Sequence, residues 1–241
     1  MAGVKHAVYC GTRNIYGDME MAAKSLIANS DVDKVHFIIE DAKFPTELPD
    51  IIECHDVSGQ TFFPPNGANS NCAWSYMTLM RAAVALMPEF SHIDRMLSLD
   101  CDTVCVRDVS PIWGTPLDGC YFAAVPESWL RRDGVAYCNI GVTLFNLAQL
   151  RDGKAGEVVD VLNRHRFGWP DQDALNYLCQ GRIALLSAEY NWCPWVAKDG
   201  TEKVRVVHYA ARNDWRNEPP AVKYRKMTWE QALNLHESFC C

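Results

Sequence analysis

Two aspartates stand one residue apart at the end of a short apolar run, Arg95-Met-Leu-Ser-Leu-Asp100-Cys-Asp102. In an extended chain, residues i and i+2 point to the same side, so Asp100 and Asp102 could face one cation together. Two carboxylates placed in this way repel each other unless a cation lies between them. A hard divalent ion, Mg²⁺ or Mn²⁺, accepts such oxygens and completes its shell with water and substrate phosphates. An isolated Asp-x-Asp also occurs in solvated turns, so the pair needs support from the rest of the chain.

The elements that must position these carboxylates follow from short apolar runs that alternate with longer helical patterns. This alternation predicts an α/β fold with a largely parallel sheet flanked by helices. We expect strands at residues 5–10, 34–39, 95–99, 120–125, 142–146, 183–186 and 204–208, and helices at 16–28, 76–87, 147–165, 171–179 and 228–239. Because ligands of open α/β sheets bind at the carboxyl ends of strands, Asp100 and Asp102 occupy a favourable place.

Two local signals add detail. Thr228 followed by Gln231 three residues later predicts a capping box at the start of the last helix. Residues 59–71, GQTFFPPNGANSN, are rich in Gly, Pro and Asn and predict a surface connection.

Composition limits the class of protein. A chain of 241 residues with 49% hydrophobic residues can close around one core, and no linker or repeat divides it, so we expect a single domain over residues 1–241. The net charge is −7 and no basic block is present, which argues against duplex nucleic acid as a partner.

The 11 cysteines are odd in number and form no CxxC pair, which favours buried free thiols in a reducing cytoplasm over disulfides or zinc sites. Cys240 and Cys241 are the exception, since exposed terminal thiols can oxidise or be lipidated. The start of the chain has no signal-peptide apolar region, and no run approaches the ~20 apolar residues that span a bilayer. We expect a soluble, cytoplasmic protein, with peripheral membrane association left open.

Four further segments, residues 75–90, 137–146, 169–176 and 204–209, surround the Asp100 pair in a familiar order and spacing. The chain resembles the family 8 retaining glycosyltransferases, which include glycogenin and bacterial lipooligosaccharide galactosyltransferases and have the GT-A fold. The resemblance covers about residues 7 to 216. It implies a single GT-A domain with a core at about residues 5–216 and a helical tail at 217–241.

The resemblance implies a metal site and a reaction. His208, at the end of a late apolar run, matches the family's third metal ligand beside Asp100 and Asp102. Such a set suits Mn²⁺, which accepts imidazole more readily than Mg²⁺ does. The implied activity is metal-dependent transfer of a hexose from a UDP-sugar, with retention of anomeric configuration.

The resemblance also implies roles for residues that contact the donor. Arg81 would neutralise donor charge, Asn139 would bond to sugar hydroxyls, Asp171 would hold donor hydroxyls, and Gln172 would lie against the β face of the anomeric carbon. Asp173 as a covalent nucleophile is the minority alternative, by analogy with retaining glycosidases. Each has a structural alternative: a helix-surface cation for Arg81, a turn residue for Asn139, and a helix N-terminus for the acidic block.

The chain departs from the family pattern after His208. Family members commonly continue with Gly, Lys, Pro and Trp at set spacings, using the lysine on the diphosphate, and this chain has no such lysine. Arg212 or Arg216 could replace its charge, since a guanidinium suits phosphate.

The N-terminal turn is also altered. It resembles the family's uridine-binding turn, in which an Asp, an Asn and a Tyr cup the base. Here Thr12 or Arg13 stands where the acid often lies, followed by Asn14 and, after one extra residue, Tyr16.

Two other classes stay open: a nucleotidyltransferase acting on sugar phosphates, and a non-catalytic relative that binds nucleotide sugar. The acceptor also stays open, among a glycan, a lipid-linked sugar, a protein side chain and a modified base. Aromatic residues could stack on a sugar or serve the core: Phe62, Phe63, Trp129, Tyr190, Trp192 and Trp195.

Overall fold

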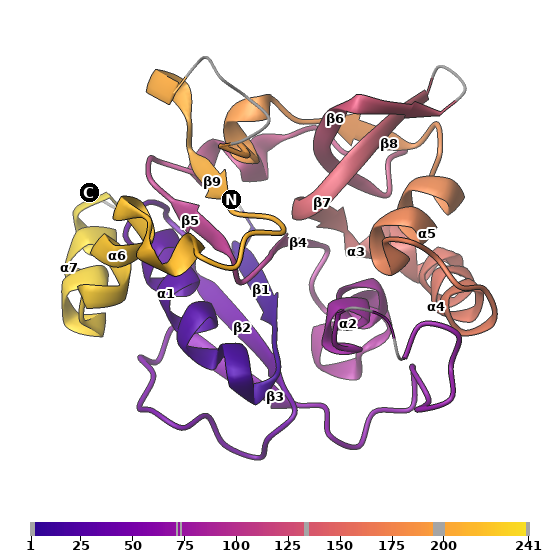
Figure 1. The fold of residues 1–241 in the computed structure, drawn as a ribbon, viewed down its shortest axis with the longest axis horizontal. Coiled ribbons are helices and arrows are strands. Elements are labelled where there is room, and N and C mark those ends of the chain that lie inside the picture. Colours follow the sequence, from indigo (N-terminus) through magenta and orange to yellow (C-terminus); the bar gives the residue numbers. More distant parts are fainter. Residues whose placement is uncertain (1–2, 71, 73, 133–134, 195–200, 240–241) are drawn as a thin grey trace.

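A seven-stranded mixed sheet runs through the molecule in the order β3-β2-β1-β4-β7-β6-β8 (Figure 1). The computed structural model describes residues 3–70, 72, 74–132, 135–194 and 201–239. Strand β1 is parallel to β2 and β4, β2 to β3, and β6 to β8, whereas β7 is antiparallel to both of its neighbours. The strands are β1 His6–Cys10, β2 Lys34–Ile39, β3 Ile52–Asp56, β4 Arg95–Leu99, β6 Phe122–Arg132, β7 Val135–Asn146 and β8 Ile183–Leu185. A second sheet pairs β5 (Thr103–Cys105) antiparallel to β9 (Val206–His208).

Helices cover both faces of the large sheet, which makes three layers (Figure 1). The α-helices are α1 Tyr16–Ile27, α2 Met77–Ala83, α3 Leu147–Arg151, α4 Lys154–Arg164, α5 Pro170–Leu178, α6 Pro219–Lys226 and α7 Trp229–Phe239. One apolar core lies between the sheet and α1, and another lies between the sheet and α2, α4 and α5. Alternation along β1 supplies both, since Tyr9 belongs to the first core and Val8 to the second. This mixed α/β architecture confirms the predicted fold class.

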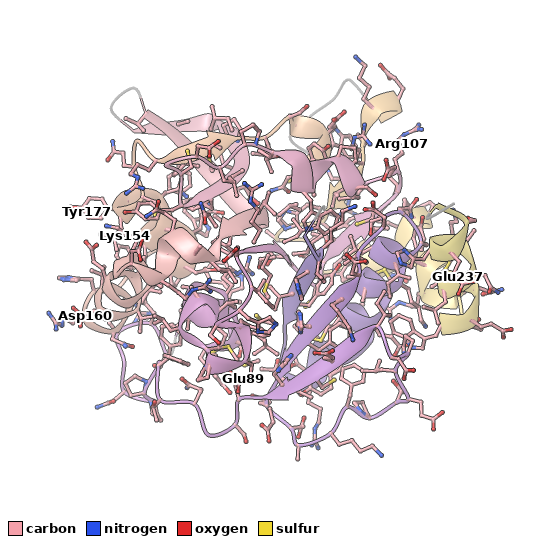
Figure 2. The ribbon with its side chains drawn as sticks, turned by 180° about the vertical axis from the view of Figure 1, so that it is seen from behind. Glu89, Arg107, Lys154, Asp160, Tyr177 and Glu237 are labelled. Carbon is pink, nitrogen blue, oxygen red and sulfur yellow. The ribbon has the colours of Figure 1, made fainter. Side chains whose placement is uncertain are left out.

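The outer helices show the expected two-sided character. Val158 and Leu162 of α4 are fully buried, whereas Tyr177 of α5 is 71% exposed. Figure 2 shows Lys154, Asp160 and Tyr177 on the outer side of this helical layer. The apolar side of α4 therefore holds it on the domain, as its spacing of apolar residues requires.

Several predicted elements differ from the structure. The strands at 34–39 and 95–99 are confirmed at their bounds, whereas those at 120–125 and 142–146 extend into the longer pair β6 and β7. The predicted helix 147–165 is two helices, because Gly153 adopts a left-handed φ of 96° between α3 and α4. Strand β3 was missed because its sequence, IECHD, is largely polar and exposed at the sheet edge. Strand β5 and helix α6 were also not predicted. Strand β5 is only three residues long, and α6 begins with two prolines.

The C-terminal helices pack on α1. The Thr228 amide donates to Oε1 of Gln231 at 2.8 Å and the Gln231 amide to Oγ1 of Thr228 at 3.2 Å, which confirms the predicted capping box. Asn29, just after α1, donates through Nδ2 to the Tyr224 hydroxyl of α6 at 2.7 Å. The helices that follow residue 216 therefore pack on α1.

The nine cysteines in the described ranges are all free, and Cys101, Cys105, Cys138 and Cys179 are buried among them. Burial raises the pKa of Cys138 to about 12, which keeps it a thiol. Cys240 and Cys241 lie outside the described residues. Among the helices that the structure describes, none is both long enough and apolar enough to cross a bilayer.

Candidate active site

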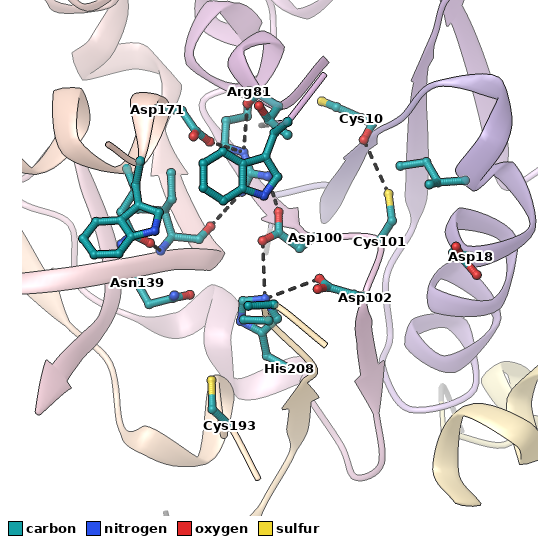
Figure 3. A pocket seen from close by; sticks show the side chains of 18 of the residues that line it. Cys10, Asp18, Arg81, Asp100, Cys101, Asp102, Asn139, Asp171, Cys193 and His208 are labelled. Atoms are coloured by element: carbon teal, nitrogen blue, oxygen red, sulfur yellow. Dashed lines mark hydrogen bonds and ion pairs between the residues drawn. The ribbon is translucent and has the colours of Figure 1, made fainter. Parts of the chain in front are cut away.

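Asp100, Asp102 and His208 converge at the carboxyl end of β4. The two aspartates lie where β4 turns into β5, and pairing of β5 with β9 places Thr103 opposite His208. Nε2 of His208 is 3.4 Å from Oδ2 of Asp100 and 3.4 Å from Oδ1 of Asp102. The three candidate ligand atoms lie within 4.8 Å of one another (Figure 3). The structure thus brings together the three residues predicted to hold a metal.

The ring of His208 is oriented by an amide that the sequence did not single out. Nδ1 of His208 lies 2.8 Å from Oδ1 of Asn191, and Nδ2 of Asn191 donates to Oδ1 of Asn139 at 2.7 Å. Since Oδ1 of Asn191 accepts, Nδ1 of His208 carries a proton, and Nε2 faces the carboxylates, where it can hold either a proton or a cation. An outer hydrogen bond of this kind orients a metal-binding histidine.

The electrostatics of the cluster favour a positive charge at its centre. Although burial opposes it, the carboxylates of Asp102 and Asp100 raise the pKa of His208 well above its usual value. Either a proton or a cation at Nε2 would relieve the repulsion between the carboxylates. The donor set of one imidazole and two carboxylates fits Mn²⁺.

Gly141 makes room for the histidine. A Cβ at this position would lie 2.1 Å from Cε1 of His208. Any larger residue would push the ring away from the aspartates. Glycine is therefore required at position 141 by the close approach of the His208 ring.

Arg81 of α2 is a buried ion-pair partner and not a helix-surface cation. It is 7% exposed, Nη2 pairs with Oδ1 of Asp100, and Nε lies 3.0 Å from Oδ2 of Asp171. Nη1 also donates to the carbonyl oxygen of Ile140 at 2.9 Å. One guanidinium therefore holds carboxylates from two different elements in place (Figure 3).

The two carboxylates differ in electrostatics. Burial raises the pKa of Asp171 to about 6, and the charge of Arg81 only partly offsets this effect. For Asp100, burial acts in the same direction, but Arg81 and His208 together hold the pKa below its usual range. Asp100 is therefore the firmly ionised member of the pair.

The first turn of α5 faces β7 and carries the next predicted residues. Pro170 begins the helix, as its fixed φ favours. Oε1 of Gln172 accepts from the Ile140 amide at 3.2 Å, and Nε2 of Gln172 lies 3.2 Å from the Tyr137 hydroxyl. These bonds fix the Gln172 amide beside Asn139 on β7.

Asp173 points elsewhere. Its Oδ1 accepts from the Tyr137 hydroxyl at 2.6 Å and its Oδ2 from the Trp169 amide at 2.9 Å. One turn later, Asn176 donates to the Cys138 carbonyl at 2.8 Å and accepts from the Cys138 amide at 2.7 Å. Both residues join α5 to its surroundings.

A cavity of about 530 Å³ opens beside the cluster. Eight residues singled out in the sequence line it: Arg81, Asp100, Asp102, Asn139, Asp171, Gln172, His208 and Arg216. Other lining residues were not predicted, among them Glu127, Trp74 and Trp169. Glu127 accepts from Nδ2 of Asn139 at 2.9 Å. Trp74 and Trp169 are 44% and 40% exposed, which is unusual for indoles and is visible only in the structure.

The structure does not bring the predicted uridine-binding residues to this cavity. Thr12 and Asn14 hydrogen-bond to each other, and neither lines it. Tyr16 is buried as the first residue of α1, its hydroxyl donates to Oδ2 of Asp41 at 2.9 Å, and its ring packs on Phe44. Ile15, the extra residue of the turn, lines the cavity instead.

The two candidate replacements for the missing lysine differ in position. Arg212 forms ion pairs with Asp214 at 2.8 Å and Glu218 at 2.7 Å, and it does not line the cavity. Arg216 does line it, with Nε 2.9 Å from Oδ1 of Asp18. Of the two arginines, Arg216 is therefore the one that places a positive charge at the cavity wall.

Four of the aromatic residues considered for stacking on a sugar belong to the core or pack against it. Phe63 and Tyr190 are buried, and Phe62 and Trp192 pack against core clusters. Trp195 and the side chain of Trp129 lie outside the part that the structure describes.

Comparison with known proteins agrees with this arrangement. The family described as "Glycosyl transferase family 8" matches residues 6–215. A lipopolysaccharide 1,2-glucosyltransferase of Escherichia coli K12 is 29% identical over 58% of this chain and 50% of its own length. A putative glycosyltransferase of Haemophilus influenzae is 24% identical over 70% of this chain and 58% of its own. The chain thus spans about half the length of these curated relatives.

Solved structures share the fold. The glycosyltransferase GlyE of Streptococcus pneumoniae TIGR4 superposes with a TM-score of 0.75 at 18% identity, over 98% of this chain and 64% of that one. The galactosyltransferase LgtC, solved with donor and acceptor sugar analogues, superposes with a TM-score of 0.67 at 21% identity, over 97% and 95% of the two chains. With its GT-A architecture and its Asp-x-Asp and histidine cluster, the chain belongs to glycosyl transferase family 8.

Proposed function

We propose that the protein is a retaining, Mn²⁺-dependent glycosyltransferase that moves a hexose from a UDP-sugar to a carbohydrate acceptor. The observation that carries this proposal is the convergence of Asp100, Asp102 and His208 on one wall of the cavity. These side chains would hold the cation, which would neutralise charge growing on the leaving diphosphate. Arg216, at the same cavity, is our candidate for a second positive charge near the diphosphate.

We assign Arg81 to the charge balance of the donor site. Its guanidinium pairs with Asp100 and Asp171 and is buried, so it holds both carboxylates at fixed positions. Its positive charge lies at the cavity wall, where it lowers the electrostatic cost of binding an anionic donor.

For the transfer itself, we favour attack by the acceptor on the same face of the sugar from which the diphosphate leaves. Asn139, Asp171 and Gln172 line the cavity and would stabilise an oxocarbenium-like state. An amide such as Gln172 is a poor nucleophile. Asp173 accepts hydrogen bonds at both oxygens and does not line the cavity, which favours a capping role over a nucleophilic one.

The donor base and the acceptor are bound, in our proposal, by residues outside the metal cluster. Ile15 is better placed than Tyr16 to contact the base, since only Ile15 lines the cavity. Exposed Trp74 and Trp169 offer faces for stacking on an acceptor sugar. A carbohydrate acceptor is also supported by the lipopolysaccharide glucosyltransferase among the relatives. We further propose that residues 1–241 form one domain, since α6 and α7 pack on α1.

The test is release of UDP from UDP-sugars with Mn²⁺, repeated with Asp100→Ala and Asp102→Ala. We expect each variant to lose at least ~100-fold in turnover, as for loss of a major electrostatic stabiliser. Asp94→Ala is the matched control, because Asp94 lies at the other end of β4 and its side chain is 82% exposed. Unchanged turnover in both site variants would remove the metal role.

The same assay separates the alternatives. A nucleotidyltransferase would release pyrophosphate and not UDP. A non-catalytic relative would bind UDP in a Mn²⁺-dependent manner without turnover across a broad acceptor panel.

A further inference from the structure

A second polar cluster lies on the first three strands, apart from the cavity. His6 is on β1, His36 on β2, and Glu53 and His55 on β3. Pairing places Glu53 opposite His36 and His55 opposite Ile38, so alternation directs these side chains to one face of the sheet. None of the four lines the cavity.

Three atoms of this cluster have the spacing of metal ligands. Nδ1 of His36 is 3.0 Å from Nε2 of His55 and 3.8 Å from Oε2 of Glu53. All three lie within 4.8 Å of one another. Tetrahedral Zn²⁺ with bonds of ~2.0–2.1 Å separates its ligand atoms by ~3.3 Å, which falls between the two measured distances.

Neighbouring groups orient the candidate ligands. Nε2 of His36 lies 2.9 Å from Nδ1 of His6, so donation of the Nε2 proton to His6 leaves the Nδ1 lone pair facing His55 and Glu53. Lys34 donates to Oε1 of Glu53 at 2.7 Å, which leaves Oε2 toward the histidines. Partners of this kind fix the tautomer and orientation of metal ligands.

Packing holds the rings in place. Phe90 lies against both rings, at 5.0 Å from His36 and 4.8 Å from His55 between ring centroids. Burial, together with the neighbouring imidazole of His55, lowers the pKa of His36 to about 3, so its ring stays neutral. Glu89, beside Phe90 and labelled in Figure 2, adds negative charge that acts on His55.

We propose that His36, His55 and Glu53 form a second metal site that binds Zn²⁺, with the fourth position taken by water. Two imidazoles and one carboxylate suit Zn²⁺, whereas the oxygen-rich cavity cluster suits Mn²⁺. The ion takes the place of the hydrogen bond between Nδ1 of His36 and Nε2 of His55, and His55 then carries its single proton on Nδ1, so that both facing nitrogens offer lone pairs. It thereby joins the edge strand β3 to β2 and stabilises that edge of the sheet.

The experiment uses the full chain carrying Asp102→Asn, which removes one proposed ligand of the cavity cluster. Zn²⁺ titration by calorimetry should show one equivalent bound, and His55→Gln and Glu53→Gln should each weaken binding by at least ~10-fold. Cys54→Ser is the matched control, because Cys54 lies between Glu53 and His55 in the sequence but on the opposite face of the sheet. The Zn²⁺ affinity of this variant should stay within about twofold of that of the Asp102→Asn protein. Zn²⁺ should raise the melting temperature of the Asp102→Asn protein, and this rise should disappear in Glu53→Gln.

Two spectra identify the ligands without reference to activity. Co²⁺ in place of Zn²⁺ should give the visible bands of a tetrahedral ion without a thiolate charge-transfer band. Nitrogen-15 spectra of the histidine side chains should show shifts at Nδ1 of His36 and Nε2 of His55. Absence of Zn²⁺ binding, equal affinity in all variants, or a thiolate band lost in Cys54→Ser would overturn the proposal. Each of these results would leave the proposed transferase activity standing, since that depends on the cavity.

Discussion

Gly141→Ala tests whether close contact with β7 holds His208 against the two aspartates. The added Cβ would lie 2.1 Å from Cε1 and 2.6 Å from Nδ1 of His208, where ordinary contact begins at 3.4 Å. The backbone of Gly141 does not adopt a left-handed φ, so alanine meets no conformational penalty there. The three atoms nearest to the added Cβ all belong to the imidazole ring, which must move by more than ~1 Å to escape the overlap.

The size of the effect follows from that displacement. Metal–ligand distances tolerate deviations of only ~0.2 Å, so the shifted ring is lost as a ligand. A misplacement of ~1 Å at a reacting site costs ~100-fold in rate, or ~3 kcal/mol in the activation free energy. Overpacking should also lower the free energy of unfolding by ~1–3 kcal/mol.

The assay is UDP release from the UDP-sugar donor as a function of Mn²⁺, with Mn²⁺ affinity measured by electron paramagnetic resonance. Gly156→Ala is the matched control, because Gly156 is exposed on α4 and an added Cβ meets nothing within 4 Å. The control should keep full activity and gain ~0.5–1 kcal/mol of stability, since alanine favours a helix over glycine. A folded Gly141→Ala protein with wild-type Mn²⁺ affinity and turnover would refute the placement of His208 as a ligand.

Three further substitutions test other contacts. Asn191→Leu removes the acceptor for Nδ1 of His208 and should weaken Mn²⁺ binding ~10- to 100-fold in the same resonance assay; unaltered affinity would show that the amide does not orient the ring. Asn176→Ala breaks both hydrogen bonds to the backbone of Cys138 and leaves buried groups unpaired, so urea denaturation should show a loss of ~2–4 kcal/mol, and a loss below ~1 kcal/mol would contradict this role. Ala211→Gly relieves a left-handed φ of 63° and should raise the free energy of unfolding by ~1 kcal/mol in thermal denaturation, whereas a lower melting temperature would show no strain there.

Local chain geometry accounts for what could be predicted. The apolar run before them predicted that Asp100 and Asp102 follow a strand, although a turn between β4 and β5, and not alternation along an extended chain, brings their carboxylates together. The spacing of Thr228 and Gln231 predicted their reciprocal cap. The apolar runs predicted seven strands of the two sheets. Strand β3 was not predicted, because a short polar strand at the edge of the sheet shows no alternation of apolar residues.

Contacts between distant segments were decided by the tertiary structure. The sequence by itself determined the α/β class, the carboxylate pair and the family motifs, because these depend on neighbouring residues and on spacing along the chain. Only the fold decided that Arg81 is buried between two carboxylates, that Tyr16 turns away from the cavity, and that His36 meets His55. Such distances depend on strand order, pairing register and packing, which arise from the whole chain at once and leave no mark in any single segment.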